Sequence, residues 1–271
     1  MSGFAHPPSF ASHRWADWRT TDFAALDPSR AVAVLPLGAT EQHGPHLPLS
    51  VDTVLVEGVV NEAIGHLTAS DPVLFLPTLP VGLSMEHTGF AGTLSLSSQT
   101  TLALWLDLAA SVARAGVKKL LLFNAHGGHV GLMDVAARDM RGQLGLTVFG
   151  SSWYQLPLGG AMQAFSAHEQ RFGVHAGDVE TSMMLALAPE HVSMSAAQNF
   201  ESAATRRAAH YNLLGDGRSA KLGWHMQDYN HQGAAGDAAD ATAKKGHALL
   251  QEAGTQLAVL LRELIEFAPL V

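Results

Sequence analysis

The residues best suited to chemistry stand in one short segment, 38–52, which carries four potential metal ligands. Glu41 and His43 alternate, so an extended backbone would direct both side chains the same way. His46 and Asp52 follow among Gly and Pro residues that indicate turns. Imidazole and carboxylate are ligands that divalent Zn, Mn and Fe accept. A polar loop with solvated charges is the alternative, but ligands at this density favour a metal site.

A second segment, 124–129, reads Asn-Ala-His-Gly-Gly-His and follows an apolar run at 117–123. Its paired glycines let the backbone approach another group closely or adopt positive φ. His126 comes first after the run and is the predicted ligand. His129 lies one helical turn later, and we interpret it as a group behind the ligands or on the surface.

A third segment, 175–180, leads into a predicted helix that continues to Leu187. Carboxylates favour a helix N-terminus, so Asp178 and Glu180 both have capping as an alternative role. We predict Glu180 as a ligand, because a helix start directs its first-turn side chains into a crevice, and Asp178 as the cap. His175 is close in sequence to Glu180, and an imidazole has a pKa suited to proton transfer.

The elements that must position these segments alternate along the chain. Apolar runs predict buried strands at 31–37, 73–77, 117–123 and 146–150. Amphipathic stretches predict helices at 52–68, 98–115, 130–142 and 238–266, with a short helix at 159–170. Such alternation favours βαβ units and a mostly parallel sheet. We therefore predict the α/β class and one domain over 1–271 with an N-terminal arm at 1–22, although two smaller domains are an alternative. Residues 195–237 show little periodicity.

In open α/β sheets the ligand crevice lies beyond the carboxyl ends of the strands, where these three segments fall. The predicted ligand set has five members: Glu41, His43, Asp52, His126 and Glu180. A catalytic Zn usually takes about three protein ligands, so five suggest two divalent ions roughly 3.5–4 Å apart, with Asp52 between them. Zn is the expected metal, and Mn and Fe are the alternatives.

A pair of such ions would produce hydroxide near neutral pH and polarise a carbonyl, which suits amide hydrolysis. The leaving nitrogen then needs a proton. His175 is predicted to supply it as the general acid/base, and Glu180 is counted with it among the catalytic residues. The chain has no cysteine and no Gly-x-Ser-x-Gly motif, so no nucleophile competes.

Two further stretches are predicted to shape a substrate pocket. Residues 82–93 mix glycines with polar side chains, and Ser84 and His87 are candidates for substrate binding. A polar connection with a satisfied His87 is an equal alternative. Trp153 follows the strand at 146–150 and is predicted to wall the pocket, with packing against the next segment as its alternative.

Composition narrows the classes of partner and compartment. The 271 residues carry a net charge of −8 and no basic run, which argues against nucleic acid or an anionic membrane as partner. No apolar stretch is suited to spanning a bilayer and no signal peptide is recognised, so we expect a cytoplasmic protein. Only 15% of the residues are charged, which suggests that part of the surface is buried in a homo-oligomer.

The segments 38–49, 124–129 and 175–182 resemble the creatininase family of metal-dependent amidohydrolases. The likeness extends over about residues 31–250. It implies an α/β/α sandwich that assembles as a hexamer and binds Zn, Mn or Fe through the five predicted ligands. His175 would be the family histidine that precedes the last glutamate.

Two positions depart from the creatinine-hydrolysing members of that family. Gly128 stands where they carry a glutamate, and Arg171 aligns with a pocket tryptophan. Both changes argue against creatinine as the substrate. Arg171 is a candidate for pairing with an anionic substrate group, with a surface arginine as the alternative. The predicted function is hydrolysis of a C–N bond in a small substrate, which is expected to be a cyclic amide or a formamide. The alternatives are a peptide-processing hydrolase of the same family and a non-catalytic metal- or ligand-binding protein.

Overall fold

A sheet of four parallel strands in the order β2-β1-β3-β4 forms the centre of the protein. The computed structural model describes residues 12–270, so residues 1–11 of the predicted arm lie outside the described residues. Each predicted apolar run overlaps one strand; β2 is shorter than predicted, and β3 and β4 end one and two residues later than predicted. The strands are β1 (Val32–Leu37), β2 (Val73–Phe75), β3 (Lys119–Asn124) and β4 (Thr147–Ser152).

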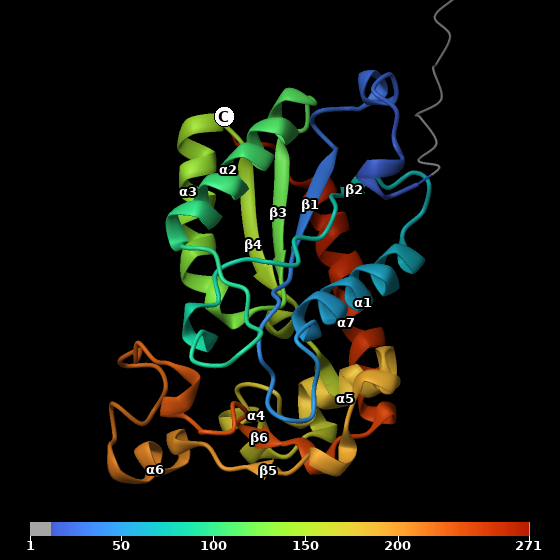
Figure 1. Ribbon diagram of the computed structural model, residues 1–271. Helices are drawn as coiled ribbons and strands as arrows, with labels where there is room; N and C mark the ends of the chain where they lie inside the picture. The colour runs from blue at the N-terminus through green and yellow to red at the C-terminus, as the bar shows by residue number, and fades with distance from the viewer. Residues whose placement is uncertain (1–11, 271) are drawn as a thin grey trace, which may run out of the picture.

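Helices cover both faces of this sheet, which confirms the predicted α/β sandwich (Figure 1). α2 (Ser98–Arg114) and α3 (Val130–Leu144) pack on one face. α1 (Val51–His66) and α7 (Ala243–Glu266) pack on the other, with α5 (Asp178–Leu187) beside them. Among residues 12–270, none of the helices combines the length and the apolar character needed to cross a bilayer.

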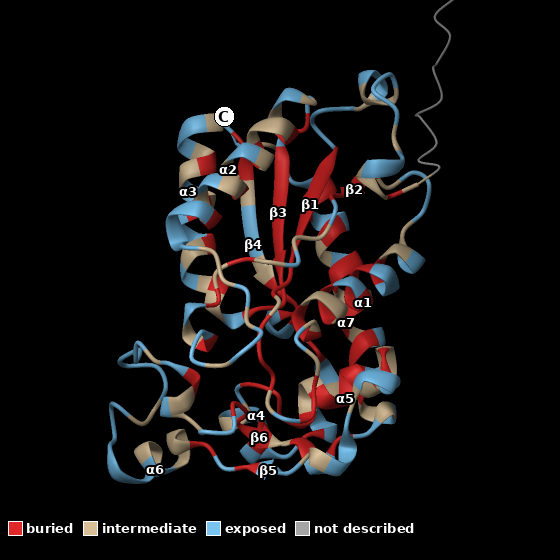
Figure 2. Cartoon of the chain, viewed as in Figure 1, coloured by how far each residue is buried: buried red, intermediate tan, exposed pale blue. Residues whose placement is uncertain are grey.

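The central strands are apolar throughout because both of their faces are covered. Val32 and Val34 of β1 join the cluster beneath α1 and α7, while Ala33 and Leu35 join the cluster beneath α2 and α3. Figure 2 shows β1 and β3 buried along their length, whereas β4 at the edge of the sheet has exposed positions. Continuous apolar runs are typical of such doubly covered parallel strands.

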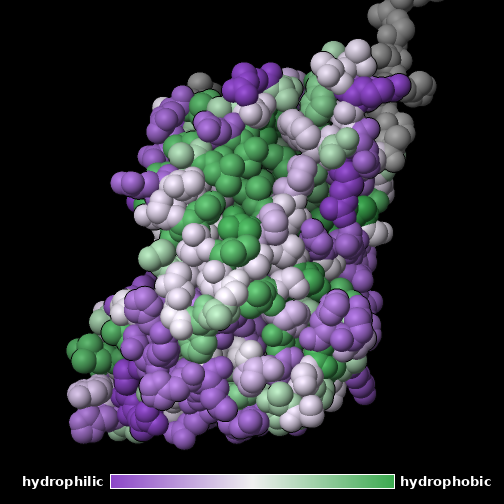
Figure 3. All heavy atoms as spheres, in the orientation of Figure 1, coloured by the Kyte–Doolittle hydropathy of each residue, from purple (hydrophilic) through white to green (hydrophobic). Residues whose placement is uncertain are grey.

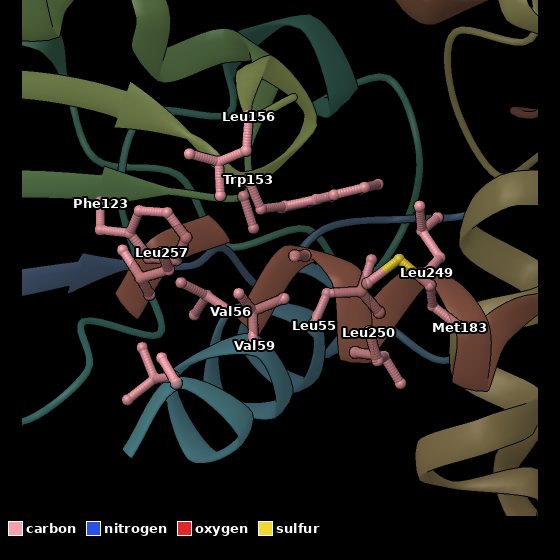
Figure 4. Close-up of a cluster of buried hydrophobic side chains, with 14 of the residues drawn as sticks. Leu55, Val56, Val59, Phe123, Trp153, Leu156, Met183, Leu249, Leu250 and Leu257 are labelled. Atoms are coloured by element: carbon pink, nitrogen blue, oxygen red, sulfur yellow. The ribbon is translucent and has the colours of Figure 1, made fainter. Parts of the chain in front are cut away.

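The larger core lies between the sheet and three helices (Figure 4). Val59 of α1, Phe123 of β3 and Leu257 of α7 are all fully buried there. Burying one such side chain contributes roughly 1.5–3 kcal/mol. Met183 of α5 and Trp153 extend this core towards the carboxyl ends of the strands. The same packing that stabilises the fold therefore supports the segments that follow the strands.

The strand register brings the carboxyl ends of three strands into line. Leu37 of β1 pairs with Asn124 of β3, and Asn124 pairs with Ser152 of β4. The segments after these strands therefore begin side by side at one edge of the sheet. In Figure 1 they lead down to a lower part of the molecule that contains α5.

The lower part also contains the region in which no element was predicted, 195–237. It holds α6 (Ala203–His210) and the two-residue strand β5 (Asn199–Phe200), which pairs antiparallel with β6 (Gly236–Asp237). The predicted helix at 159–170 divides into a 3-10 turn (Gly159–Ala164) and α4 (Ala167–Phe172).

A buried lysine joins the start of β3 to the end of the last helix. The Lys119 side chain is 1% exposed, and its Nζ donates to the carbonyl oxygens of Leu264, Ile265 and Phe267 at 2.7, 2.9 and 3.1 Å. The last carbonyls of a helix have no partner within the helix, and a lysine side chain satisfies them. Lys119 therefore fixes α7 against the sheet.

Replacing this lysine tests how much the contact contributes. Lys119→Met is expected to lower the free energy of unfolding by about 1–3 kcal/mol, because buried carbonyls lose their donor. Urea unfolding followed by circular dichroism measures the change. Lys118→Met is the matched control, since Lys118 is exposed and should change stability by no more than about 0.5 kcal/mol. Equal stability of the two variants would contradict the structural role of Lys119.

Candidate metal centre

The five predicted ligands converge beyond the carboxyl edge of the sheet. Glu41 and His43 lie in the segment after β1, and His126 follows β3. Asp52 and Glu180 stand in the first turns of α1 and α5, where the helix dipole favours a carboxylate. Four of them are buried, and the side chain of Glu180 is 18% exposed. The parallel topology thus assembles residues that are up to 139 positions apart, from Glu41 to Glu180.

Asp52 lies between two groups of ligand atoms. On one side, His126 Nδ1 is 3.1 Å from Glu41 Oε1 and 3.5 Å from Asp52 Oδ2. On the other, His43 Nε2 is 3.8 Å from Asp52 Oδ1 and 3.9 Å from Glu180 Oε2. Glu41, Asp52 and His126 form one cluster able to hold a metal ion, and His43 and Glu180 form another with His175.

Three of these ligand atoms are buried without a hydrogen bond. Glu41 Oε2, His43 Nε2 and Asp52 Oδ2 have no hydrogen-bond partner among residues 12–270. Buried polar atoms are almost always partnered, because leaving one unsatisfied costs about 1–3 kcal/mol. Two carboxylate oxygens and an imidazole nitrogen are the donor set of a divalent transition metal or Zn. The residues therefore fit such an ion.

The electrostatics of the centre show the same need for positive charge. Burial raises the pKa of Glu41 to about 7, against the lowering effect of His126. Burial and the charge of Asp52 raise the pKa of Glu180 to about 8. Burial also acts to raise the pKa of Asp52, but the His126 ring, 3.5 Å away, and the other nearby imidazoles lower this pKa to about 2. Three carboxyl groups confined together compete for ionisation, and a bound cation would favour all three carboxylates.

Two more imidazoles border the centre and are held by Gln42. His175 Nε2 lies 2.7 Å from the carbonyl oxygen of Gln42, so this nitrogen carries the proton and donates it. The other ring nitrogen, Nδ1, lies 4.0 Å from Glu41 Oε1. His87 Nε2 is 3.3 Å from the same oxygen, and its Nδ1 is 2.8 Å from Gln42 Nε2. The role of Gln42 was not predicted, although it stands between two predicted ligands.

A buried glutamate outside the predicted set holds the segment that carries His175 and Glu180. Glu169 accepts hydrogen bonds from the backbone N–H groups of Asp178 at 2.7 Å and Asp237 at 2.8 Å. It thereby ties α4 to the start of α5 and to β6. Ala176, next to His175, has φ of +54°, and its N–H donates to Glu180 Oε2 at 2.5 Å. Both partners of Glu169 are brought to it by the fold, so a single sequence offers no signal for its role.

The centre opens into a cavity of about 460 Å³. His87 and Trp153 line it, and Trp153 also packs in the main core; their part in binding a substrate stays a prediction. Ser84 does not line it: this residue is buried, and its Oγ is 3.4 Å from His126 Nε2. Arg171 borders a separate cavity. His129 is buried behind His126, where its Nε2 accepts the Leu83 N–H at 3.1 Å.

Gly128 permits the observed position of His126. A Cβ atom at position 128 would overlap His126 Nε2 and Glu86 Oε1. Glu86 was not predicted as a site residue, yet it lines the cavity, and its Oε1 is 3.4 Å from His126 Nε2. At Gly127 an added Cβ would meet nothing within 4 Å. The second glycine of the pair therefore serves a close approach, as the sequence pattern predicted for the pair.

One family model and several known proteins are similar to this chain. The family model described as Creatininase: creatinine amidohydrolase matches residues 16–261. A mycofactocin precursor peptide peptidase from Mycobacterium ulcerans is 35% identical over 165 residues, which cover 59% of this chain and 59% of that protein. A creatinine amidohydrolase from Pseudomonas putida is 32% identical over 177 residues, or 60% of this chain and 66% of that protein. The matches thus span about three fifths to two thirds of these relatives.

Solved structures extend the likeness to nearly the whole chain. A creatininase described as a Mn form and a creatininase variant described as a Zn–Zn type each superpose with a TM-score of 0.73. Each match covers 93% of this chain and 98% of the solved chain at 24% identity. At that identity the likeness shows the fold alone.

The glycine pair offers a direct test of the centre. Gly128→Ala is expected to weaken Zn²⁺ binding by about 10–100-fold, as for lost support of a ligating histidine, because the added methyl group displaces the His126 ring. Isothermal titration calorimetry measures the affinity. Gly127→Ala is the matched control and should bind Zn²⁺ like the unaltered chain. If both variants bound equally well, the close approach at position 128 would not matter for metal binding.

Proposed function

Since the chain belongs to the creatininase family of hydrolases, we propose that it is a metal-dependent amidohydrolase acting on a small amide, lactam or formamide. The observation that carries this proposal is the convergence of five imidazole and carboxylate side chains, three of them with an unpartnered buried atom. The Mn and Zn–Zn forms among the solved family members support a divalent metal. The proposed complement is two ions per chain, Zn in the first instance and Mn or Fe otherwise.

Two overlapping ligand groups would hold these ions. Glu41, Asp52 and His126 form the first group, and Asp52, His43 and Glu180 form the second, so that Asp52 contributes one oxygen to each. When bound, divalent cations supply Lewis acidity, which lowers the pKa of water towards neutrality and polarises a substrate carbonyl.

His175 transfers the proton that the leaving nitrogen requires. Its Nε2–H is committed to the Gln42 carbonyl, so the neutral ring presents an unprotonated Nδ1 towards Glu41. The ring is flanked by His43 and His87, with centroids at 4.1 and 4.3 Å, which fix its plane. In this orientation Nδ1 accepts the proton that water releases when its oxygen adds to the substrate carbonyl, and it passes this proton to the leaving nitrogen as the C–N bond breaks.

Part of the cavity wall is apolar. Trp153, Leu156 and Leu158 form this part and would contact the apolar portion of a substrate. A volume of about 460 Å³ accommodates a small molecule, which favours the small-amide form of the proposal. Gly128, which stands where the creatinine-hydrolysing family members carry a glutamate, argues against creatinine as the substrate.

A peptide-processing hydrolase is the second candidate function. The match to a peptide peptidase at 35% identity favours it, although that match covers 59% of each protein. Parallel assays of cyclic amides, formamides and short peptides on the metal-loaded protein distinguish the two. A homohexamer in the cytoplasm remains the proposed state, and light scattering tests the assembly.

Metal content tests the ligand set. The unaltered chain is expected to retain about two equivalents of Zn²⁺ after gel filtration. Glu41→Gln should retain about one equivalent or less, because a neutral amide replaces a carboxylate ligand. Glu57→Gln is the control, since Glu57 lies on α1 as Asp52 does but is exposed. Full metal content in Glu41→Gln would contradict the proposed site.

Turnover tests the proton transfer. His175→Ala is expected to lower kcat by about 10²–10⁴-fold on any amide that the protein hydrolyses, with both metal equivalents retained. His191→Ala, at an exposed histidine, serves as the control. Loss of metal from His175→Ala would make His175 a ligand instead, as its place in the His43 and Glu180 cluster also permits. Unchanged kcat would refute the proton-transfer role.

A further inference from the structure

A second cavity lies against the candidate active site and has the opposite charge. It has a volume of about 350 Å³ and shares Val174 and Trp224 with the first cavity. Three cationic side chains line it, Arg171, Arg207 and Lys221, together with one carboxylate, Asp216. We call this cavity the basic annex.

We propose that the basic annex is a subsite for a carboxylate or phosphate group of the substrate whose C–N bond is cleaved in the first cavity. This inference rests on the proposed function and specifies its substrate class. The substrate would be an amide with an anionic group at one end.

The cations of the annex are available for such a group. No ion pair or side-chain hydrogen bond engages Arg171, Arg207 or Lys221 within residues 12–270. The carboxylate of Asp216 accepts hydrogen bonds from the backbone of Arg218 and from Ser219, so local contacts already occupy it. Guanidinium groups bind carboxylate and phosphate in a bidentate manner, which suits the two arginines.

Aromatic rings connect the annex with the metal centre. The ring of His87 meets Trp224 edge-on at 6.0 Å between centroids, and Trp224 meets Tyr229 edge-on at 5.0 Å. The Arg207 guanidinium lies 4.6 Å from the centroid of the Tyr229 ring. Stacking on Tyr229 restricts the orientation of the guanidinium before an anion arrives. The series of contacts therefore runs from a side chain beside Glu41 to a cation of the annex.

The first cavity lacks a comparable partner for an anion. Its described lining has no lysine or arginine and includes five carboxylates: Glu41, Asp52, Glu86, Glu169 and Glu180. An anionic substrate end placed there would meet like charges, or would compete with the reacting carbonyl for a bound cation. Arg171 and Arg207 in the basic annex would give the anionic end a separate site. The annex therefore fixes which end of the substrate faces the metal centre.

The surface around the basic annex is suited to a polar ligand. α6 carries Arg207, and the segment that follows it carries Asp216 and Lys221. Figure 3 shows mainly hydrophilic side chains over this lower part of the molecule, while hydrophobic side chains gather higher on the same face.

Paired substrates test the proposal on the metal-loaded chain. A formamide that carries its carboxylate at the end of a flexible chain, N-formyl-6-aminohexanoate, is compared with its carboxamide, and a phosphate-ended formamide of similar length is compared with its alcohol. The unaltered chain is expected to prefer the anionic member of a pair, and the pair with the larger preference distinguishes carboxylate from phosphate. The double variant Arg171→Gln, Arg207→Gln should remove this preference. We expect its KM for the anionic member to rise about tenfold, with kcat little changed. Arg206→Gln is the matched control, because Arg206 is the exposed neighbour of Arg207 on α6 and pairs with Glu201.

Binding of inorganic phosphate gives a second readout that needs no turnover. Calorimetry on the metal-loaded chain should show a phosphate-binding step, separate from any phosphate bound at the metal centre, that the double arginine variant loses and the Arg206→Gln variant keeps. Identical phosphate binding in all three proteins, or an equal KM for both members of every pair, would overturn the proposal. If no amide is hydrolysed at all, the proposed function fails, while the phosphate titration still decides whether the annex binds anions.

Discussion

The structure depends on one electrostatic constraint: three carboxylates from two segments, 38–52 and 175–180, lie close together in the interior. Glu41 and Asp52 are almost fully buried, and the side chain of Glu180 is 18% exposed. Such charges are stable only when a cation, a proton or a set of hydrogen-bond donors compensates them. The imidazole of His126 provides part of that compensation, and the carboxylate oxygens without a hydrogen-bond partner are the part left uncompensated. The rest of the fold holds these three carboxylates close together despite their mutual repulsion.

The supporting contacts are distributed over the whole chain. The parallel register aligns the ends of β1, β3 and β4, so the segments that follow them start at the same edge. Gln42 orients two imidazoles through its backbone and side chain, and Glu169 binds the backbone around the start of α5. Gly128 leaves room for the His126 ring. None of these groups needs to react, yet each fixes the position of one that does.

Local patterns in the sequence predicted the strands, most helices and the convergence of the ligands. Buried parallel strands are apolar on both faces, so their runs are easily recognised, and the motif around Glu41 is dense in ligands. The same reasoning missed α6, which is short and lies in a region of weak periodicity. It also missed Glu169 and Lys119, whose partners at Asp237 and Leu264 are 68 and 145 residues away. Such roles arise from the tertiary fold and leave no local pattern. The placement of Ser84 behind His126 is of the same kind.

The packing of α7 has a consequence for the order in which the protein folds. This helix completes the core beside α1 and α5, and Lys119 binds its last carbonyls. Until α7 has packed, the apolar faces of α1 and α5 lack their cover, and the helix that carries Glu180 lacks much of its support. The final arrangement around Glu180 therefore forms only after the docking of a helix that contributes none of the candidate ligands.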